Sequence, residues 1–174
     1  MPVKSNPKTE LRPSLEDDLA ELTSLLPVTL HALKNAVPAP MPMRDVMERA
    51  SLAKRHATAL LAVAAVEPIS VSELAKRLGL LLSSTSTIVG ELSRTGLLER
   101  AEDEQDRRRT IVRVHADYRD DMEGWLEVAF APVRTALERL SPLARAHFME
   151  GWRILHEEAA LRGSDEDQDG DFET

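Results

Sequence analysis

Apolar residues at helical spacing occupy most of the chain. Leucines recur at steps of three and four residues from Leu15 to Leu33, which predicts an amphipathic helix that Ser14 would cap. A second helical region runs from Arg44 to Val66, with an interruption expected near Ser51. Its last ten residues, ATALLAVAAV, are apolar on most sides, so we expect this helix to be buried.

Two short helices joined by a tight turn are predicted next. Ser70 and Glu73 fit a capping box, in which the serine caps the helix and the glutamate reaches back to the cap backbone. This helix should end at Gly79. Three leucines form the turn, and either Ser83 or Ser84 should cap the following helix. The arrangement is that of a helix-turn-helix.

The second of these helices, residues 84–94, has one apolar and one polar face. Ile88, Val89 and Leu92 must face the core. The positions left for solvent or a ligand are Thr85, Ser86, Thr87, Gly90 and Glu91. Gly96 can end the helix because it adopts the left-handed conformation without steric cost.

A charged hairpin follows directly. The segments Leu97–Ala101 and Thr110–Val114 read as short strands, and the tip between them is the charged run EDEQDRRR. A helix that runs into a charged hairpin is the outline of a winged helix-turn-helix. In that fold the helix enters the major groove of DNA, and the hairpin reaches the flanking backbone or the minor groove.

Two further helices are predicted after the hairpin. Asp117 should cap a long helix that bends at Pro132, and Ser141 followed by a proline should start the last helix, which ends near Leu161. Its expected apolar face consists of Phe148, Trp152, Leu155 and Ala159. The predicted fold class is therefore mainly α with a small β wing.

The distribution of charge matters more than its total. The chain of 174 residues has a formal net charge of −8, but six of its 30 acids lie after Gly163. Without these six, 24 acids stand against 22 Lys and Arg, a net charge of about −2. Such a body can bind DNA where its bases are concentrated, as at Arg107, Arg108, Arg109 and Arg113. The acidic tail is either a disordered solubilising end or a segment that competes with DNA for the basic wing.

Several classes of protein are disfavoured by what the sequence lacks. The absence of cysteine excludes disulfides, Cys-ligated zinc and thiol redox sensing. No apolar run reaches the roughly 20 residues that span a bilayer, and the first residues lack a signal-peptide core, so we expect a cytoplasmic protein with no membrane partner. There is no phosphate-binding Gly-rich loop or nucleophile elbow, so we expect neither an enzyme nor a cofactor. The five histidines contain no His-x-x-x-His pair, so we expect no metal site.

The string LAKRLGL…SSTSTIVGELSRTGLLER…EQDRRRTIVRV, between Val71 and Val114, resembles the MarR family of bacterial transcription regulators. That family has an Asp-x-Arg motif in its wing, which Asp106-Arg107-Arg108 matches. The resemblance implies that Arg108 enters the minor groove and that Asp106 orients it.

The remaining DNA contacts follow from the same resemblance. Arg107 and Arg109 should meet phosphates. The groove-facing residues should be Ser83, Ser84, Ser86 and Thr87, although the family often has a basic residue about where Thr87 stands. Hydroxyl contacts would then replace arginine readout of guanine. Glu91 could accept from a cytosine amino group, but we favour a position off the groove.

The resemblance also implies a homodimer joined through its first and last helices, which binds a near-palindromic operator in double-stranded DNA. The apolar residues of these helices exceed what a winged helix of about 65 residues covers alone. The expected organisation is an arm at 1–14, one domain at 15–162 with its winged helix at about 51–115 and dimerisation helices at about 15–37 and 117–162, and a disordered acidic tail at 163–174.

Many relatives of this kind are repressors that respond to small lipophilic or phenolic ligands in a cleft beside the winged helix. Here the candidate residues for such a cleft are His31, Arg55, His56 and Trp125. The alternative function is a winged helix that recognises protein, for instance an anti-repressor that does not bind DNA directly. Glu91 and the acidic tail favour that alternative.

Overall fold

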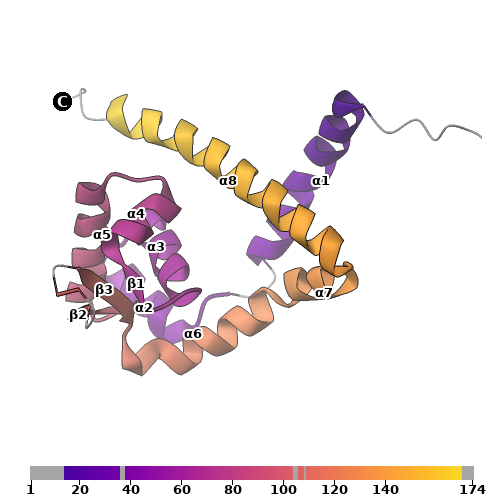
Figure 1. The fold of residues 1–174 in the computed structure, drawn as a ribbon. Coiled ribbons are helices and arrows are strands. Elements are labelled where there is room, and N and C mark those ends of the chain that lie inside the picture. Colours follow the sequence, from indigo (N-terminus) through magenta and orange to yellow (C-terminus); the bar gives the residue numbers. More distant parts are fainter. Residues whose placement is uncertain (1–13, 36–37, 104–105, 108, 170–174) are drawn as a thin grey trace, which may run out of the picture. The chain divides into compact units, whose positions relative to one another are not determined.

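Helix α1 (Leu15–Asn35) forms a unit separate from the rest of the chain. The computed structural model describes residues 14–35, 38–103, 106–107 and 109–169 (Figure 1). They divide at Val37 and Pro38 into two units. Ser14 caps α1 as predicted, because its hydroxyl accepts from the Asp17 N–H at 3.2 Å. The Asp17 carboxylate in turn accepts from the Ser14 N–H at 3.1 Å. The Ser14 hydroxyl also donates to the Asp17 carboxylate at 2.8 Å, and this bond, together with the bond from the Ser14 N–H, lowers the pKa of Asp17.

The leucines of α1 are exposed within this unit. Leu15, Leu19, Leu22, Leu26 and Leu30 show between 38% and 79% of their surface. A stripe of this width on one helix face is what a packing partner would cover.

The second unit begins with two helices that frame a turn. Helix α2 (Met41–Arg49) starts earlier than the predicted Arg44, because Pro42 is accommodated in its first turn, where no intrahelical N–H is needed. Helix α3 (Lys54–Ala64) follows. The predicted interruption near Ser51 is confirmed: this residue has a positive φ of 53°.

The helix-turn-helix consists of α4 (Val71–Leu78) and α5 (Leu82–Arg94). Ser70 caps α4 as predicted, and its hydroxyl accepts from the Glu73 N–H at 3.2 Å. The Glu73 side chain forms an ion pair with Arg77 at 3.5 Å. Gly79 ends α4 in the left-handed conformation, with φ 65°.

A three-stranded antiparallel sheet completes the winged helix, in the order β1-β3-β2. Strands β2 (Leu98–Glu102) and β3 (Thr110–Val114) agree with the predicted hairpin. Strand β1 (Ile69–Ser70) was not predicted, because two residues are too short to show an alternating pattern. It pairs with β3 at Val112 and Ile111.

The core lies among α3, α4, α5 and the sheet, which gather on one side of the second unit in Figure 1. Leu60, Leu74 and Leu92 are almost completely buried, and they come from α3, α4 and α5 respectively. Val112 and Val114 of β3 are buried between them while Arg113 is exposed, which is the alternation expected for a strand with one covered face.

The C-terminal helices differ in detail from prediction. Helix α6 (Ala116–Ala129) is capped by His115, whose Nδ1 accepts from the Asp117 N–H at 3.3 Å, so the predicted Asp117 cap is wrong by two residues. The expected bend at Pro132 is a break at Phe130, after which α7 (Ala131–Arg139) begins.

The last helix, α8 (Pro142–Asp169), starts at the predicted cap: the Ala144 N–H donates to Ser141 Oγ at 3.2 Å. It continues beyond the predicted end near Leu161, so residues 163–169 of the expected disordered tail are helical. Residues 170–174 lie outside the described residues, as does most of the predicted arm at 1–14. Among the residues that the structure describes, no helix is both long and apolar enough to cross a membrane.

Replacement of Gly79 and of Gly90 by alanine should change the free energy of unfolding in opposite directions. A Cβ at Gly79 would lie 2.8 Å from Ala160 Cβ of α8, and its φ is positive; a Cβ at Gly90, inside α5, would meet nothing within 4 Å. Gly79→Ala should therefore destabilise the protein by about 1–2 kcal/mol or more. Gly90→Ala should stabilise it by about 0.5–1 kcal/mol, because glycine is a poor helix former. Urea unfolding followed by circular dichroism measures both, and equal stability of the two variants would contradict the assigned backbone geometry.

Candidate nucleic-acid interface

Helix α5 presents a hydroxyl-rich face to solvent. Ile88, Val89 and Leu92 are buried as predicted, whereas Ser83 and Thr87 are exposed. The Thr87 hydroxyl donates to the Ser83 carbonyl at 3.2 Å, so part of this face is already ordered. One face of the helix is thereby fixed in the core and the opposite face is left for a partner.

The predicted exposure of Thr85 is wrong. Thr85 is fully buried, and its hydroxyl donates to the Leu81 carbonyl at 3.0 Å. Threonine can occupy a core position on a helix because this bond satisfies its one polar group.

The predicted serine cap of α5 is also wrong. The N-cap is Leu81, which makes no side-chain cap bond, so Ser83 and Ser84 lie within the first turn, and both are exposed. Ser86, one turn further on, is half-buried. The first N–H groups of an uncapped helix carry partial positive charge and attract anions such as phosphate.

His56 and Glu91 connect α3 to α5. His56 is only 3% exposed. Its Nε2 is hydrogen-bonded to Glu91 Oε2, and its Nδ1 accepts from the Ala53 N–H at 3.1 Å. The bond to His56 lowers the pKa of Glu91 below its ordinary value of 4.5, and the positive charges of Arg94 and Arg55 act in the same direction against desolvation. The Glu91 carboxylate is thus turned toward α3.

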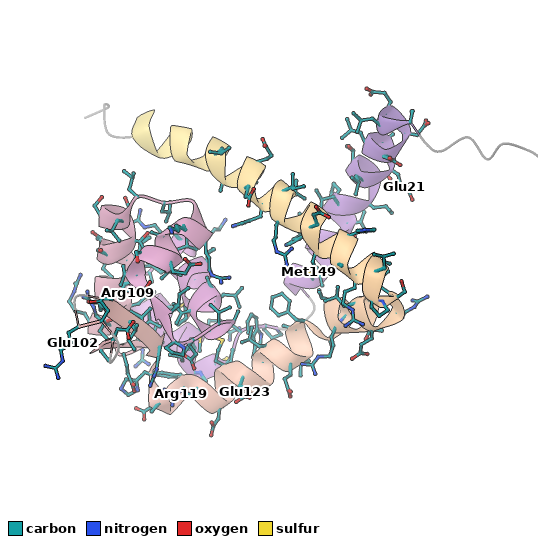
Figure 2. The ribbon with its side chains drawn as sticks, in the orientation of Figure 1. Glu21, Glu102, Arg109, Arg119, Glu123 and Met149 are labelled. Carbon is teal, nitrogen blue, oxygen red and sulfur yellow. The ribbon has the colours of Figure 1, made fainter. Side chains whose placement is uncertain are left out.

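The wing carries the predicted arginines with different degrees of constraint. Arg107 and Asp106 are exposed, and Arg108 lies outside the described residues. Arg109, directly before β3, is restrained: its Nη2 donates to Ser70 Oγ at 3.1 Å and its Nη1 lies 4.0 Å from Asp103 Oδ2. Figure 2 labels Arg109 and Glu102 at the wing. The Arg109 side chain is still 51% exposed, so it can meet a phosphate while it braces the hairpin.

A second network joins the wing to α6. Arg119, labelled in Figure 2, donates to the Val114 carbonyl at 3.0 Å and forms an ion pair with Glu67 at 3.3 Å. The Glu67 carboxylate also accepts from the Val114 N–H, and Glu99 accepts from the Ala116 N–H at 2.9 Å. No spacing in the sequence indicates these contacts, because their partners come from β2, β3, α6 and the loop before β1.

The residues proposed for a ligand cleft come from both units. His56 is occupied by Glu91 and Ala53, and Arg55 beside it is exposed. Trp125 is half-buried against the core, and His31 lies on α1, in the other unit. Among the described residues, no three His, Asp or Glu side chains are grouped as a metal site would require.

The second unit has the fold of a winged helix-turn-helix with helical extensions. The crystal structure of Streptococcus pneumoniae FabT in complex with DNA matches this chain with a TM-score of 0.56 at 18% identity, over 84% of this chain and 97% of that one. A MepR-like protein complexed with pseudoligands matches with a TM-score of 0.51 at 16% identity, over 84% and 96%. These similarities concern the fold.

Sequence comparison supports the resemblance. Residues 51–109, which include most of the winged helix, match the sequence model of the MarR family. MarR proteins are transcription regulators and not enzymes. The chain is also 30% identical over 87 residues to YfiV, an uncharacterized HTH-type transcriptional regulator of Bacillus subtilis (strain 168). The aligned part is 50% of this chain and 54% of YfiV, so the chain spans about half the length of this curated relative.

The lowered pKa of Glu91 predicts a pH-dependent contribution to stability. A carboxyl whose pKa is lower in the folded state stabilises the fold above its unfolded value, here 4.5, and loses that effect as the pH falls through its folded pKa. Glu91→Gln should therefore be less stable than the unaltered protein above pH 4.5, and the difference should shrink as the pH falls through the folded-state pKa of Glu91. Denaturant unfolding across this range measures it. Glu123→Gln, which removes an exposed carboxylate of α6, controls for net charge, and a constant difference for Glu91→Gln would refute the assignment.

Proposed function

We propose that the chain is a DNA-binding transcription regulator that acts as a homodimeric repressor on a near-palindromic operator. The observation that carries the proposal is the exposed, hydroxyl-rich face of α5 beside a wing with exposed arginines, in a MarR-family segment. The α5 hydroxyls can contact phosphates and base edges, and the Thr87 methyl group can contact thymine.

The wing supplies the positive charge in this proposal. Arg107 and Arg109 contact phosphates, and Arg108 enters the minor groove under the orienting influence of Asp106. A carboxylate and a guanidinium form a directional pair, and a narrow minor groove attracts arginine. Arg109 is suited to its role because its bond to Ser70 limits the rotation of its side chain before DNA arrives.

The alternative function is recognition of protein. Two sequence features favoured it, Glu91 on the recognition helix and the acidic tail, and the structure weakens the first of them. Glu91, the acid within α5, is hydrogen-bonded to His56, and the exposed positions of that helix carry the apolar Leu82, hydroxyls or the basic Arg94. We therefore favour DNA as the partner.

A homodimer is part of the proposal because large apolar side chains are exposed on both terminal helices. Leu19 and Leu22 of α1 and Trp152 and Leu155 of α8 each show about half of their surface or more. The Phe148 and Trp152 rings stack on each other with centroids 6.3 Å apart, which forms an aromatic patch on α8. Two-fold pairing through these helices would place two α5 helices for half-sites about 34 Å apart.

The proposal also includes a small lipophilic or phenolic effector, whose support is the family resemblance. A site for it would use Trp125 and Arg55 rather than His56, because the two ring nitrogens of His56 already have partners. His31 would contribute only if the dimer places α1 beside this part of the winged helix.

Removal of Arg108 tests the DNA contact. Arg108→Ala should lower affinity for the DNA directly upstream of the chain's own gene by roughly tenfold or more, since a groove contact contributes about 1–3 kcal/mol. The fold should survive because the tip of an exposed hairpin adds little to the core. A gel-shift titration across salt measures affinity and its salt dependence, and Arg139→Ala on α7 is the matched control. Equal affinity of the Arg108→Ala variant and the unaltered protein would show that the assignment to Arg108 is wrong.

Trp152 tests the dimer. Because Trp152 is 49% exposed, Trp152→Glu should leave the fold intact and place a charge in the proposed interface. Sedimentation velocity should show dimers for the unaltered protein and monomers for this variant. Glu150→Lys, on the opposite face of α8, is the control and should remain dimeric. A monomeric unaltered protein, or an unchanged dimer in Trp152→Glu, would exclude pairing through this face.

A further inference from the structure

Glu91 occupies an unfavourable place for a helix that faces DNA. It lies one turn after Thr87 and two turns after Ser83 and Ser84, so a helix of 3.6 residues per turn puts it near the exposed hydroxyl face. A carboxylate that points out from this face would repel the phosphates. The Glu91 side chain is 30% exposed, so neighbouring side chains do not enclose it. Its direction therefore depends on its hydrogen-bond and charge partners.

The group that holds Glu91 is His56. The Nδ1 of its ring accepts from the Ala53 N–H at 3.1 Å, so that nitrogen carries no proton. The ring proton is then on Nε2, where it donates to Glu91 Oε2. The backbone of α3 thereby sets the tautomer of His56, and the tautomer supplies a donor aimed at α5.

The surroundings of Glu91 support an inward position. Arg55, next to His56 on α3, and Arg94, three residues after Glu91 on α5, both attract its negative charge. His56 itself is buried and satisfied at both nitrogens, so it cannot follow the carboxylate outward without leaving the Ala53 N–H unpaired.

We propose that His56 is a positioning residue for DNA binding, which keeps the Glu91 carboxylate turned away from the DNA-facing surface of α5. The proposal rests on the proposed function. Without the Nε2 donor, the carboxylate is free to rotate toward solvent and toward the phosphates. The hydroxyls of Ser83 and Thr87 then share their surface with a negative charge, and affinity for DNA falls.

His56→Leu removes the donor while it keeps an apolar side chain of similar volume in the buried site. It should lower affinity for the upstream DNA by roughly tenfold at low salt, because a newly exposed like charge near a phosphate costs of the order of 1 kcal/mol or more. The loss should shrink as salt screens the repulsion. His56→Gln keeps an N–H donor and should retain most of the affinity.

The decisive measurement is the double variant His56→Leu/Glu91→Gln. If His56 acts through the charge of Glu91, removal of that charge should restore affinity to within about threefold of the unaltered protein. If His56 serves only packing, the double variant should bind as weakly as His56→Leu, since the buried site is altered in the same way in both. Glu91→Gln alone should bind DNA as the unaltered protein does. Thermal unfolding of each variant verifies that the proteins compared are folded.

The outcomes separate this proposal from the proposed function. Specific DNA binding by the unaltered protein, with loss in His56→Leu and recovery in the double variant, supports both. Specific binding with no loss in His56→Leu, or with no recovery in the double variant, overturns the role of His56 alone. No specific binding by the unaltered protein overturns the proposed function and the role of His56 with it. If His56→Leu does not fold, His56→Met, which also lacks a donor, and its Glu91→Gln double take its place: a loss of affinity that the double restores supports the proposal, and no loss, or a loss without recovery, overturns it.

Discussion

Burial of one face of α5 is the constraint on which the rest of the winged helix depends. Ile88, Val89 and Leu92 are fully or almost fully buried against side chains of α3, α4 and the sheet. Because a helix is rigid about its axis, the burial of these three residues also decides which residues point outward. The polar face of α5 is therefore a consequence of core packing, and the cost of rotating it is the exposure of three apolar side chains, about 1.5–3 kcal/mol each.

Polar contacts determine the directions of long side chains that core packing does not restrain. Core burial fixes the rotation of α5 but not the direction of a long side chain at its edge, such as Glu91. His56 fixes that direction from α3. In the same way Ser70 restrains Arg109 beside the tip of the wing, and Arg119 ties the last residue of β3 to α6. The contacts of His56 and Ser70 join elements far apart in sequence, so the DNA-facing groups depend on the assembled unit.

The sequence predicted what periodicity and local chemistry determine. The helix-turn-helix, the hairpin, the Ser70 cap and the Gly79 end follow from residues within one or two turns of each other, and the structure has all of them. The failures have local causes too. Thr85 was assigned to the surface because its residue type is polar, although a hydroxyl that bonds the carbonyl four residues back can be buried. Ser83 and Ser84 were interpreted as caps, although the helix starts at Leu82, two residues before the predicted start.

The contacts of His56 were beyond sequence reasoning for a different reason. His56 and Glu91 are 35 residues apart, and neither lies in a motif that demands the other. The sequence offered His56 as a candidate for binding an effector. In the structure His56 is buried, and both of its ring nitrogens are hydrogen-bonded, so neither is free to bind an effector. The exposed leucines of α1 and the aromatic patch of α8 are the converse case. The apolar pattern of these helices was visible in the sequence. An apolar face does not by itself show which partner covers it, so the association state of the whole chain must be measured.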